Sequence, residues 1–237
     1  DNARLKRDYQ LWWENSITSA GNVTSLLYAA LGKDFSEKNK KLLGTPFAQF
    51  MKFTSEIRTL FKVGEKQHIA ARLMGGVLWS YGNQTIAPYS EQFYIGGANS
   101  LRAFTVRSLG PGTYNPGKNT KYGYLDQTGD IKLEANVEYR FPIFGDLYGA
   151  TFLDAGNVWL MRKDENRPGG EFTLKNFAKS IALNTGVGVR YDLTFLVIRL
   201  DMGIALHVPY ETGKSGYYNI PKFKDGLGLH FAIGYPF

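Results

Sequence analysis

The sequence contains no cysteine, and only three of its 237 residues are histidine. The missing cysteines exclude disulfide scaffolds, thiol catalysis and zinc sites with cysteine ligands. His68, His207 and His230 lack the spacing of a metal-binding set, so we expect neither a metal nor a cofactor. The chain also has no phosphate-binding loop and no Gly-x-Ser-x-Gly motif. These absences argue against an enzyme.

Long hydrophobic runs are also missing, because no stretch of about eighteen residues is uniformly apolar. This excludes a membrane-spanning helix. A membrane-spanning strand needs only about ten residues of alternating character, so the same observation leaves that possibility open. The first residues, Asp1-Asn2-Ala3-Arg4, do not resemble a signal peptide. We expect either that one has been removed or that the chain is part of a longer polypeptide.

Charge of one sign is not concentrated anywhere, although the formal net charge is +7. Basic residues alternate with acidic ones along most of the chain, as in Lys132, Glu134, Glu138 and Arg140. Nucleic-acid binding usually needs a basic tract or patch. We therefore expect no nucleic-acid partner.

The strongest positive signal is alternation of apolar and polar residues with a period of two, which is typical of β-strands with two different faces. Leu196, Ile198 and Leu200 alternate with Val197, Arg199 and Asp201, for example. The pattern predicts an all-β, antiparallel fold of about eight strands. The predicted strands are 8–18, 47–61, 67–79, 131–141, 148–160, 181–191, 195–208 and 227–237.

The predicted connections alternate between short and long. Short ones are expected at 62–66, 142–147 and 192–194, and long ones at 19–46, 80–130, 161–180 and 209–225. In an antiparallel meander this places every tight turn at one end, which is the layout of a transmembrane β-barrel of the outer membrane. Within the first long connection, Asn22 is expected to cap a short helix that ends at Gly32.

A soluble β-sandwich is the alternative, because two sheets could also bury such apolar faces against each other. Two features favour the barrel. The polar faces combine charges of both signs with glycine, as expected of a crowded, water-filled lumen. The apolar faces end in aromatic residues, where an interfacial girdle would lie. These aromatic residues are Tyr148, Tyr191, Tyr235 and Phe237.

Residues 94–112 carry a motif, with Gly96-Gly97, a short spacer and Leu101-Arg102-Ala103-Phe104. It resembles the sixth-loop signature of the bacterial surface antigen family of BamA and TamA assembly barrels, in which glycine is usual at the position of Ala103. Phe152-Leu153-Asp154-Ala155-Gly156 is similar to a second family motif, and the terminal Phe237 to the C-terminal signal of outer-membrane barrels. The whole looks closest to the TamA-like lipoproteins of Bacteroidetes.

The resemblance implies that residues 1–237 form the C-terminal half of a sixteen-stranded barrel, as strands nine to sixteen. Segment 80–130 would be the sixth extracellular loop, folded back into the lumen. Arg102 would meet Glu138 and Asp154 there, because a planar guanidinium can satisfy two carboxylates. The resemblance also implies three further groups of positions. The loop motif is Gly96, Gly97, Leu101 and Phe104, and the barrel motif is Phe152 and Gly156. The C-terminal signal and seam are Gly228, Phe231, Ile233, Gly234, Tyr235 and Phe237.

By the same resemblance, we expect an integral protein of the bacterial outer membrane that inserts or translocates client proteins. Glycines in the last strand would let the barrel open laterally, and a client strand would add to that edge. The implied partners are the remaining barrel strands, periplasmic domains, unfolded clients and membrane lipid, with accessory assembly subunits as further candidates. A passive pore, or the anchor of an enzyme whose catalytic domain lies upstream, are the alternatives.

Overall fold

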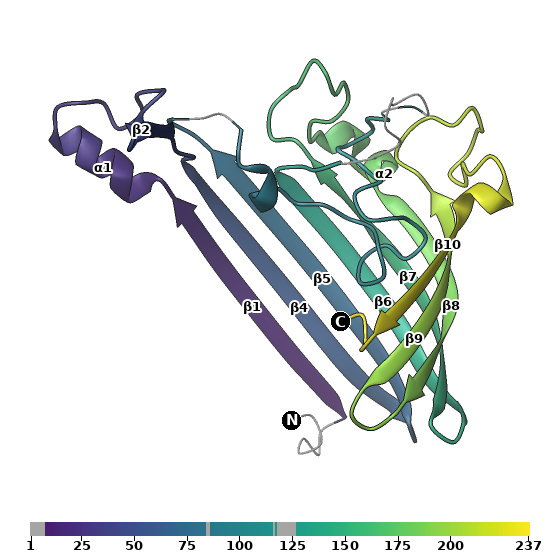
Figure 1. The fold of residues 1–237 in the computed structure, drawn as a ribbon. Coiled ribbons are helices and arrows are strands. Elements are labelled where there is room, and N and C mark those ends of the chain that lie inside the picture. Colours follow the sequence, from purple (N-terminus) through teal and green to yellow (C-terminus); the bar gives the residue numbers. More distant parts are fainter. Residues whose placement is uncertain (1–7, 84–85, 116, 118–126) are drawn as a thin grey trace.

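The computed structural model describes residues 8–83, 86–115, 117 and 127–237. Its main element is one eight-stranded antiparallel sheet in which each strand pairs with the next in sequence (Figure 1). All eight predicted strands are present. They are β1 (Tyr9–Ala20), β4 (Phe50–Gly64), β5 (Gln67–Ser80), β6 (Ile131–Phe144), β7 (Leu147–Trp159), β8 (Ala182–Asp192), β9 (Val197–His207) and β10 (Leu227–Ile233).

The sheet curves into an open trough, and β1 and β10 form its two edges. Tight turns join β4 to β5, β6 to β7, and β8 to β9, and all the long connections leave from the opposite end of the strands, as predicted (Figure 1). Residues 84–85, 116 and 118–126 of the predicted loop, and residues 1–7 before β1, lie outside the described part of the chain.

The two faces of the sheet have opposite character. On the convex face apolar side chains are exposed, with Val187 at 53% and Leu153 at 47%. On the concave face, Glu138, Arg190 and Asp201 are fully buried. Within the described residues the only other sheet is a small hairpin of β2 (Lys41–Leu42) and β3 (Thr45–Pro46). The apolar faces therefore do not meet in a sandwich core, and the soluble alternative is wrong.

The apolar core lies inside the trough, where the long connections fold against the sheet. Leu78 and Val158 of the wall pack there with Ile95, Leu101 and Leu109 of the connection between β5 and β6. None of the helices in the described ranges is long and apolar enough to cross a membrane.

The predicted helix in the first long connection is α1 (Asn22–Ala30). Its N-cap is Gly21, with a φ of 73°, and not Asn22, so the predicted cap is off by one residue. Gly21 takes the place because a side chain there would overlap the backbone of Ala48, at 2.2 Å from its carbonyl oxygen. The other helical segments are short. They are α2 (Phe177–Ser180), η2 (Tyr89–Glu91), η3 (Leu174–Asn176) and η4 (Phe223–Gly226).

The last strand ends earlier than predicted, at Ile233. Gly234 has a φ of 85°, and its N–H donates to the carbonyl of Val197 at 2.8 Å, which turns the chain away from the strand direction. The rings of Tyr235 and Phe237 then lie near guanidinium groups of the concave face, Tyr235 at 4.2 Å from Arg140. The prediction that these two aromatic residues belong to a membrane girdle is therefore wrong, because the strand ends at Ile233.

Candidate functional site in the lumen

The connection between β5 and β6 makes a tight turn before it reaches the wall of the trough. Gly96 and Gly97 have φ values of 95° and 93°, a region that favours glycine. A Cβ at Gly96 would lie 2.2 Å from the carbonyl oxygen of Thr105. The N–H of Gly97 donates to the carbonyl of Phe104 at 2.8 Å, which closes the segment into a compact loop. The two glycines are therefore required by the shape of the loop.

The loop is fixed by apolar contacts on both sides of its arginine. Leu101 is fully buried in the core cluster, and Phe104 packs against the same cluster. Burial of a leucine side chain contributes about 1.5–3 kcal/mol. These contacts hold the backbone of Arg102 against the wall, so its side chain has little freedom to choose other partners.

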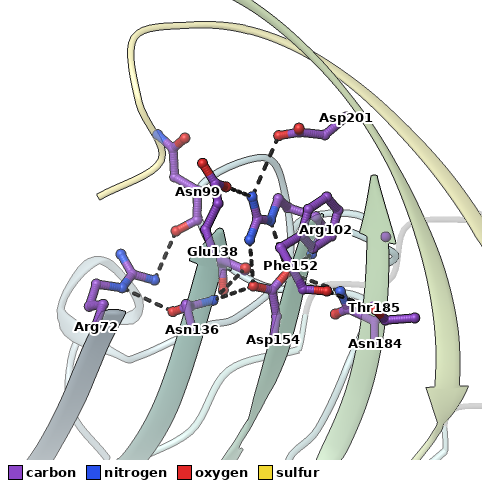
Figure 2. A network of polar contacts seen from close by, with 12 residues as sticks. Arg72, Asn99, Arg102, Asn136, Glu138, Phe152, Asp154, Asn184, Thr185 and Asp201 are labelled. Atoms are coloured by element: carbon purple, nitrogen blue, oxygen red, sulfur yellow. Dashed lines mark hydrogen bonds and ion pairs between the residues drawn. The ribbon is translucent and has the colours of Figure 1, made fainter. Parts of the chain in front are cut away.

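Arg102 is fully buried and is hydrogen-bonded to acids from two strands, and a third acid, Asp201 on β9 (Val197–His207), lies 3.8 Å from its Nη1 (Figure 2). Its Nε and Nη2 donate to the two carboxylate oxygens of Asp154 on β7, at 3.0 and 2.8 Å. Its Nη1 donates to Glu138 on β6. The structure thus brings together the three residues that the sequence pointed to. The bidentate geometry with Asp154 requires a planar fork of donors, which lysine lacks.

Asp154 is also held in place by its neighbours on the wall. Asn136 on β6 and Asn184 on β8 each donate to its carboxylate at 2.9 Å. The backbone N–H of Arg102 donates to it as well, at 3.2 Å. The carboxylate oxygens therefore have partners on several sides, as a buried charge requires.

Glu138 is the centre of a second set of ion pairs. Arg140 and Arg190 contact it at 2.8 and 2.9 Å, in addition to Arg102. Arg190 also contacts Asp201 on β9, which Arg199 meets at 3.1 Å. The guanidinium of Arg199 in turn donates to the loop carbonyl of Ala98 at 2.9 Å. The loop is thereby tied to four neighbouring strands, β6 to β9.

A further branch runs along the other side of the loop. Arg72 on β5 donates to the carbonyl of Asn99 at 2.9 Å and is paired with Glu134 on β6. The hydroxyl of Ser100 donates to Glu134 at 2.9 Å and accepts the N–H of Gly96. The loop therefore also binds polar groups on the β5 and β6 side.

The barrel motif on β7 supplies the surface on which the arginine lies. The guanidinium carbon of Arg102 is 3.5 Å from the ring centroid of Phe152, a cation–π contact. Phe152 itself is 97% buried, since only 3% of it is exposed. Gly156 stands where a Cβ would be 2.6 Å from the carbonyl of Leu133, so this position favours glycine by close packing of β6 against β7.

Glycines of β9 and β10 let the loop backbone approach the wall. A Cβ at Gly203 would lie 2.4 Å from the carbonyl oxygen of Arg102, and one at Gly228 would lie 2.8 Å from that of Ala103. Ala103 occupies the usual glycine position without a positive φ, so alanine fits there. The part of Gly228 in a seam stays a prediction, and in the structure this glycine packs closely against the loop.

The remaining predicted positions lie at the edge strand and do not join this network. Phe231 and Ile233 point outward from β10 and are each 69% exposed, which suits contact with lipid. Gly234, Tyr235 and Phe237 form the turn and tail described above. The role of this segment as a seam stays a prediction.

Several residues of the network were not among the predicted site residues. They share one signal, since each is polar on a strand whose other face is apolar. They are Arg72, Glu134, Asn136, Asn184, Arg190, Arg199 and Asp201.

Electrostatics keeps Arg102 charged in spite of its burial. Burial lowers the pKa of its guanidinium, but the hydrogen bonds and charges of Asp154 and Glu138 outweigh that cost and raise the pKa above its ordinary value. The site can therefore hold a segment in place by charge. Within the described residues, no cluster of three or more His, Asp or Glu side chains could hold a metal ion.

The chain is similar to known proteins along most of its length. Residues 28–237 match the Omp85 superfamily domain. The outer membrane protein assembly factor BamA of Neisseria meningitidis serogroup B is 34% identical over 90 residues, which cover 35% of this chain and 11% of that protein. The BamA of Nitratidesulfovibrio vulgaris is 23% identical over 227 residues, covering 89% of this chain and 26% of that protein.

A eukaryotic relative agrees with these matches. The sorting and assembly machinery component 50 homolog of Xenopus tropicalis is 26% identical over 170 residues, covering 69% of this chain and 34% of that protein. The chain therefore spans about a third or less of the length of these relatives.

The crystal structure of BamA from Haemophilus ducreyi lacking POTRA domains 1–3 has the same fold. Its TM-score is 0.52 at 16% identity, covering 78% of this chain and 35% of that chain. Closer kinship to the TamA-like lipoproteins stays a prediction. The exposed convex face and buried charged face described above agree with a membrane barrel. The chain belongs to the Omp85 superfamily and forms part of an integral β-barrel of the outer membrane.

Proposed function

We propose that this chain is the C-terminal half of an outer-membrane assembly barrel, which inserts or translocates client proteins without chemical turnover. The relatives' own names, as assembly factors and as sorting and assembly machinery, support this function. The observation that carries the proposal is the loop anchored in the lumen by Arg102, since a fully buried and fully paired arginine gives the loop one fixed position.

The open edges of the sheet support a requirement for further strands. Within the described part of the chain, β1 pairs only with β4, and β10 pairs only with β9. Unpaired backbone groups cannot face lipid, so additional strands must complete the wall. We infer that they belong to the rest of the polypeptide, as strands one to eight, and that periplasmic domains accompany them.

β10 supports a lateral seam between the last and first strands. β10 has seven residues, whereas β1 has twelve. The free edge of so short a strand can make few hydrogen bonds to the first strand, so few would have to break when the seam opens. A client strand could then add to this edge through main-chain hydrogen bonds, which need little particular sequence.

The proposal is tested in cells that depend on the full-length protein. Replacing Arg102→Ala should strongly reduce the amount of folded client proteins in the outer membrane, while the variant itself still reaches the membrane. Arg102→Lys should restore activity only in part, because it keeps the charge but loses the fork of donors. Arg167→Ala is the matched control, because Arg167 forms a partly exposed ion pair with Asp164 in another connection.

Normal client levels with Arg102→Ala would contradict the proposed role of the anchored loop. Conductance of the intact barrel separates the assembly factor from a passive pore. A large, steady current through the unmodified protein would favour the pore and overturn the proposal.

A further inference from the structure

The helix α1 buries its polar side and exposes its apolar side, which is the opposite of a surface helix on a soluble protein. Its polar residue Ser25 is fully buried, whereas its apolar residues are exposed. These apolar residues follow helical spacing and form one stripe. Their exposed fractions are 74% for Val23, 60% for Leu26, 62% for Leu27 and 81% for Leu31, which directly follows the helix.

A group of polar residues around Gln49, the polar hub, fixes this orientation of the helix. Gln49, which is 1% exposed, accepts a hydrogen bond from the hydroxyl of Ser25 at 2.9 Å. Its amide also donates to Asn22 at 3.3 Å, and Tyr81 donates to the same Asn22 oxygen at 2.8 Å. Rolling the helix to bury its leucines would leave these buried polar groups without partners. The exposed stripe is therefore a built feature of the connection.

The stripe begins where the membrane-facing surface of the sheet ends. β1 ends at Ala20, and α1 starts at Asn22, so a single residue separates the strand from the helix. On β1, Ile17 is 70% exposed and lies opposite Phe53 of β4, which is 45% exposed. Figure 1 shows α1 at the end of β1, outside the trough and away from the connections that fill it. The exposed stripe of the helix thus directly follows the exposed apolar residues of the wall along the chain.

The residues that follow the helix carry more basic than acidic charge. Lys33, Lys38 and Lys41 are exposed, and the acids in this stretch are Asp34 and Glu37. Its fourth lysine, at position 40, is buried and is not available to a partner. An apolar stripe beside exposed lysines is the pattern of a helix that lies in a lipid–water interface near anionic headgroups.

We propose that α1 is an interfacial helix that lies in the outer leaflet of the membrane. Its stripe of Val23, Leu26, Leu27 and Leu31 contacts the acyl chains, and Lys33, Lys38 and Lys41 contact anionic headgroups. Lipid is the occupant because the stripe continues the lipid-facing side of β1. The helix therefore fixes the depth of this edge of the barrel in the bilayer.

A single thiol tests the proposal, since this chain has no cysteine of its own. Leu27→Cys in the full-length protein, without other reactive cysteines, is labelled with an environment-sensitive fluorophore and placed in bilayers. Quenching by lipids brominated on the acyl chain is compared with quenching by iodide in water. Ile17→Cys serves as the lipid-facing reference, and Glu165→Cys, at an exposed position in the connection between β7 and β8, as the water-facing one.

Quenching of Leu27→Cys by brominated lipid to within about twofold of Ile17→Cys, with weak iodide quenching, is the expected result. Strong iodide quenching, like that of Glu165→Cys, would show that the stripe faces water and would overturn the proposal. Quenching by neither agent would show that another part of the polypeptide covers the helix, which also overturns it. The heat-modified gel mobility of each variant checks that the barrel is folded.

Discussion

The two long connections that flank β4 and β5 leave the same end of the sheet, yet they differ in whether their leucines are buried. The connection between β5 and β6 buries Leu101 together with the charged Arg102. The connection between β1 and β4 buries Ser25 and Gln49 and leaves its leucines exposed. One connection fills the lumen, and the other lies outside it (Figure 1).

The difference shows that available partners decide which side of a connection is buried. The wall of β6 and β7 offers the carboxylates of Glu138 and Asp154, so a charged loop can be buried there with its hydrogen bonds made. Beside β1 the buried acceptor is an uncharged amide, Gln49, which binds the polar side of α1. The apolar side must then find a partner other than water.

The largest effect is expected from removing the shared acceptor of the lumen loop. Asp154→Ala removes one buried acceptor from each of Arg102, Asn136 and Asn184. The free energy of unfolding of the full-length protein should fall by about 3–5 kcal/mol, measured by urea denaturation in lipid. Asp164→Ala removes a partly exposed ion pair in another connection and should cost less than about 1 kcal/mol. Equal effects would break the comparison between buried and exposed charges.

Matched leucines sharpen the contrast between the two connections. Leu101→Ala leaves a cavity in the core cluster and should lower the free energy of unfolding by about 2–5 kcal/mol. Leu27 is 62% exposed. Leu27→Ala should therefore lower the free energy of unfolding clearly less than Leu101→Ala in the same experiment. If both leucines cost the same, the two connections do not differ as described.

A glycine under the loop is the next most sensitive position. At Gly203 a Cβ would lie 2.4 Å from the carbonyl of Arg102, whereas at Gly75 the nearest atom would be 3.9 Å away. Gly203→Ala should therefore lower the free energy of unfolding by about 1–3 kcal/mol through overpacking. Gly75→Ala is the control and should be nearly neutral. A neutral Gly203→Ala would indicate that the loop does not press against β9.

The smallest effect is expected at the polar hub of α1. Ser25→Ala removes one buried hydrogen bond to Gln49 and should cost about 1 kcal/mol. Faster amide hydrogen exchange in α1, with unchanged exchange in β6 and β7, is the measurement. Thr24→Ala is the control, because Thr24 is only partly buried on the same helix. Unchanged hydrogen exchange in α1 would show that the polar hub does not fix the orientation of the helix.

The strands and the central ion pairs could be predicted from the sequence. Period-two alternation is strong here because one face is uniformly apolar and the other polar, so each strand identifies itself locally. Arg102, Glu138 and Asp154 were predicted from motifs. The other ion pairs of the lumen depend on where the loop lies over β8 and β9, and no local pattern records that position. Arg190, Arg199 and Asp201 were therefore missed as site residues.

Two further features of the structure do not follow from the sequence pattern alone. Alternation of apolar residues continues to Phe237, but the positive φ of Gly234 ends the strand at Ile233. The spacing of leucines predicted α1 correctly but could not say which side is buried. That choice depends on Gln49, which is distant in sequence and close in space.

A double-mutant cycle between Arg102 and Asp154 tests the central claim, that the loop is held in the lumen by this pair. Arg102→Ala, Asp154→Ala and the double variant of the full-length protein are compared by urea denaturation in lipid. We predict strong non-additivity, with a coupling free energy of about 2 kcal/mol or more. Additive losses, with coupling near zero, would show that the two side chains do not interact and would contradict the anchored loop.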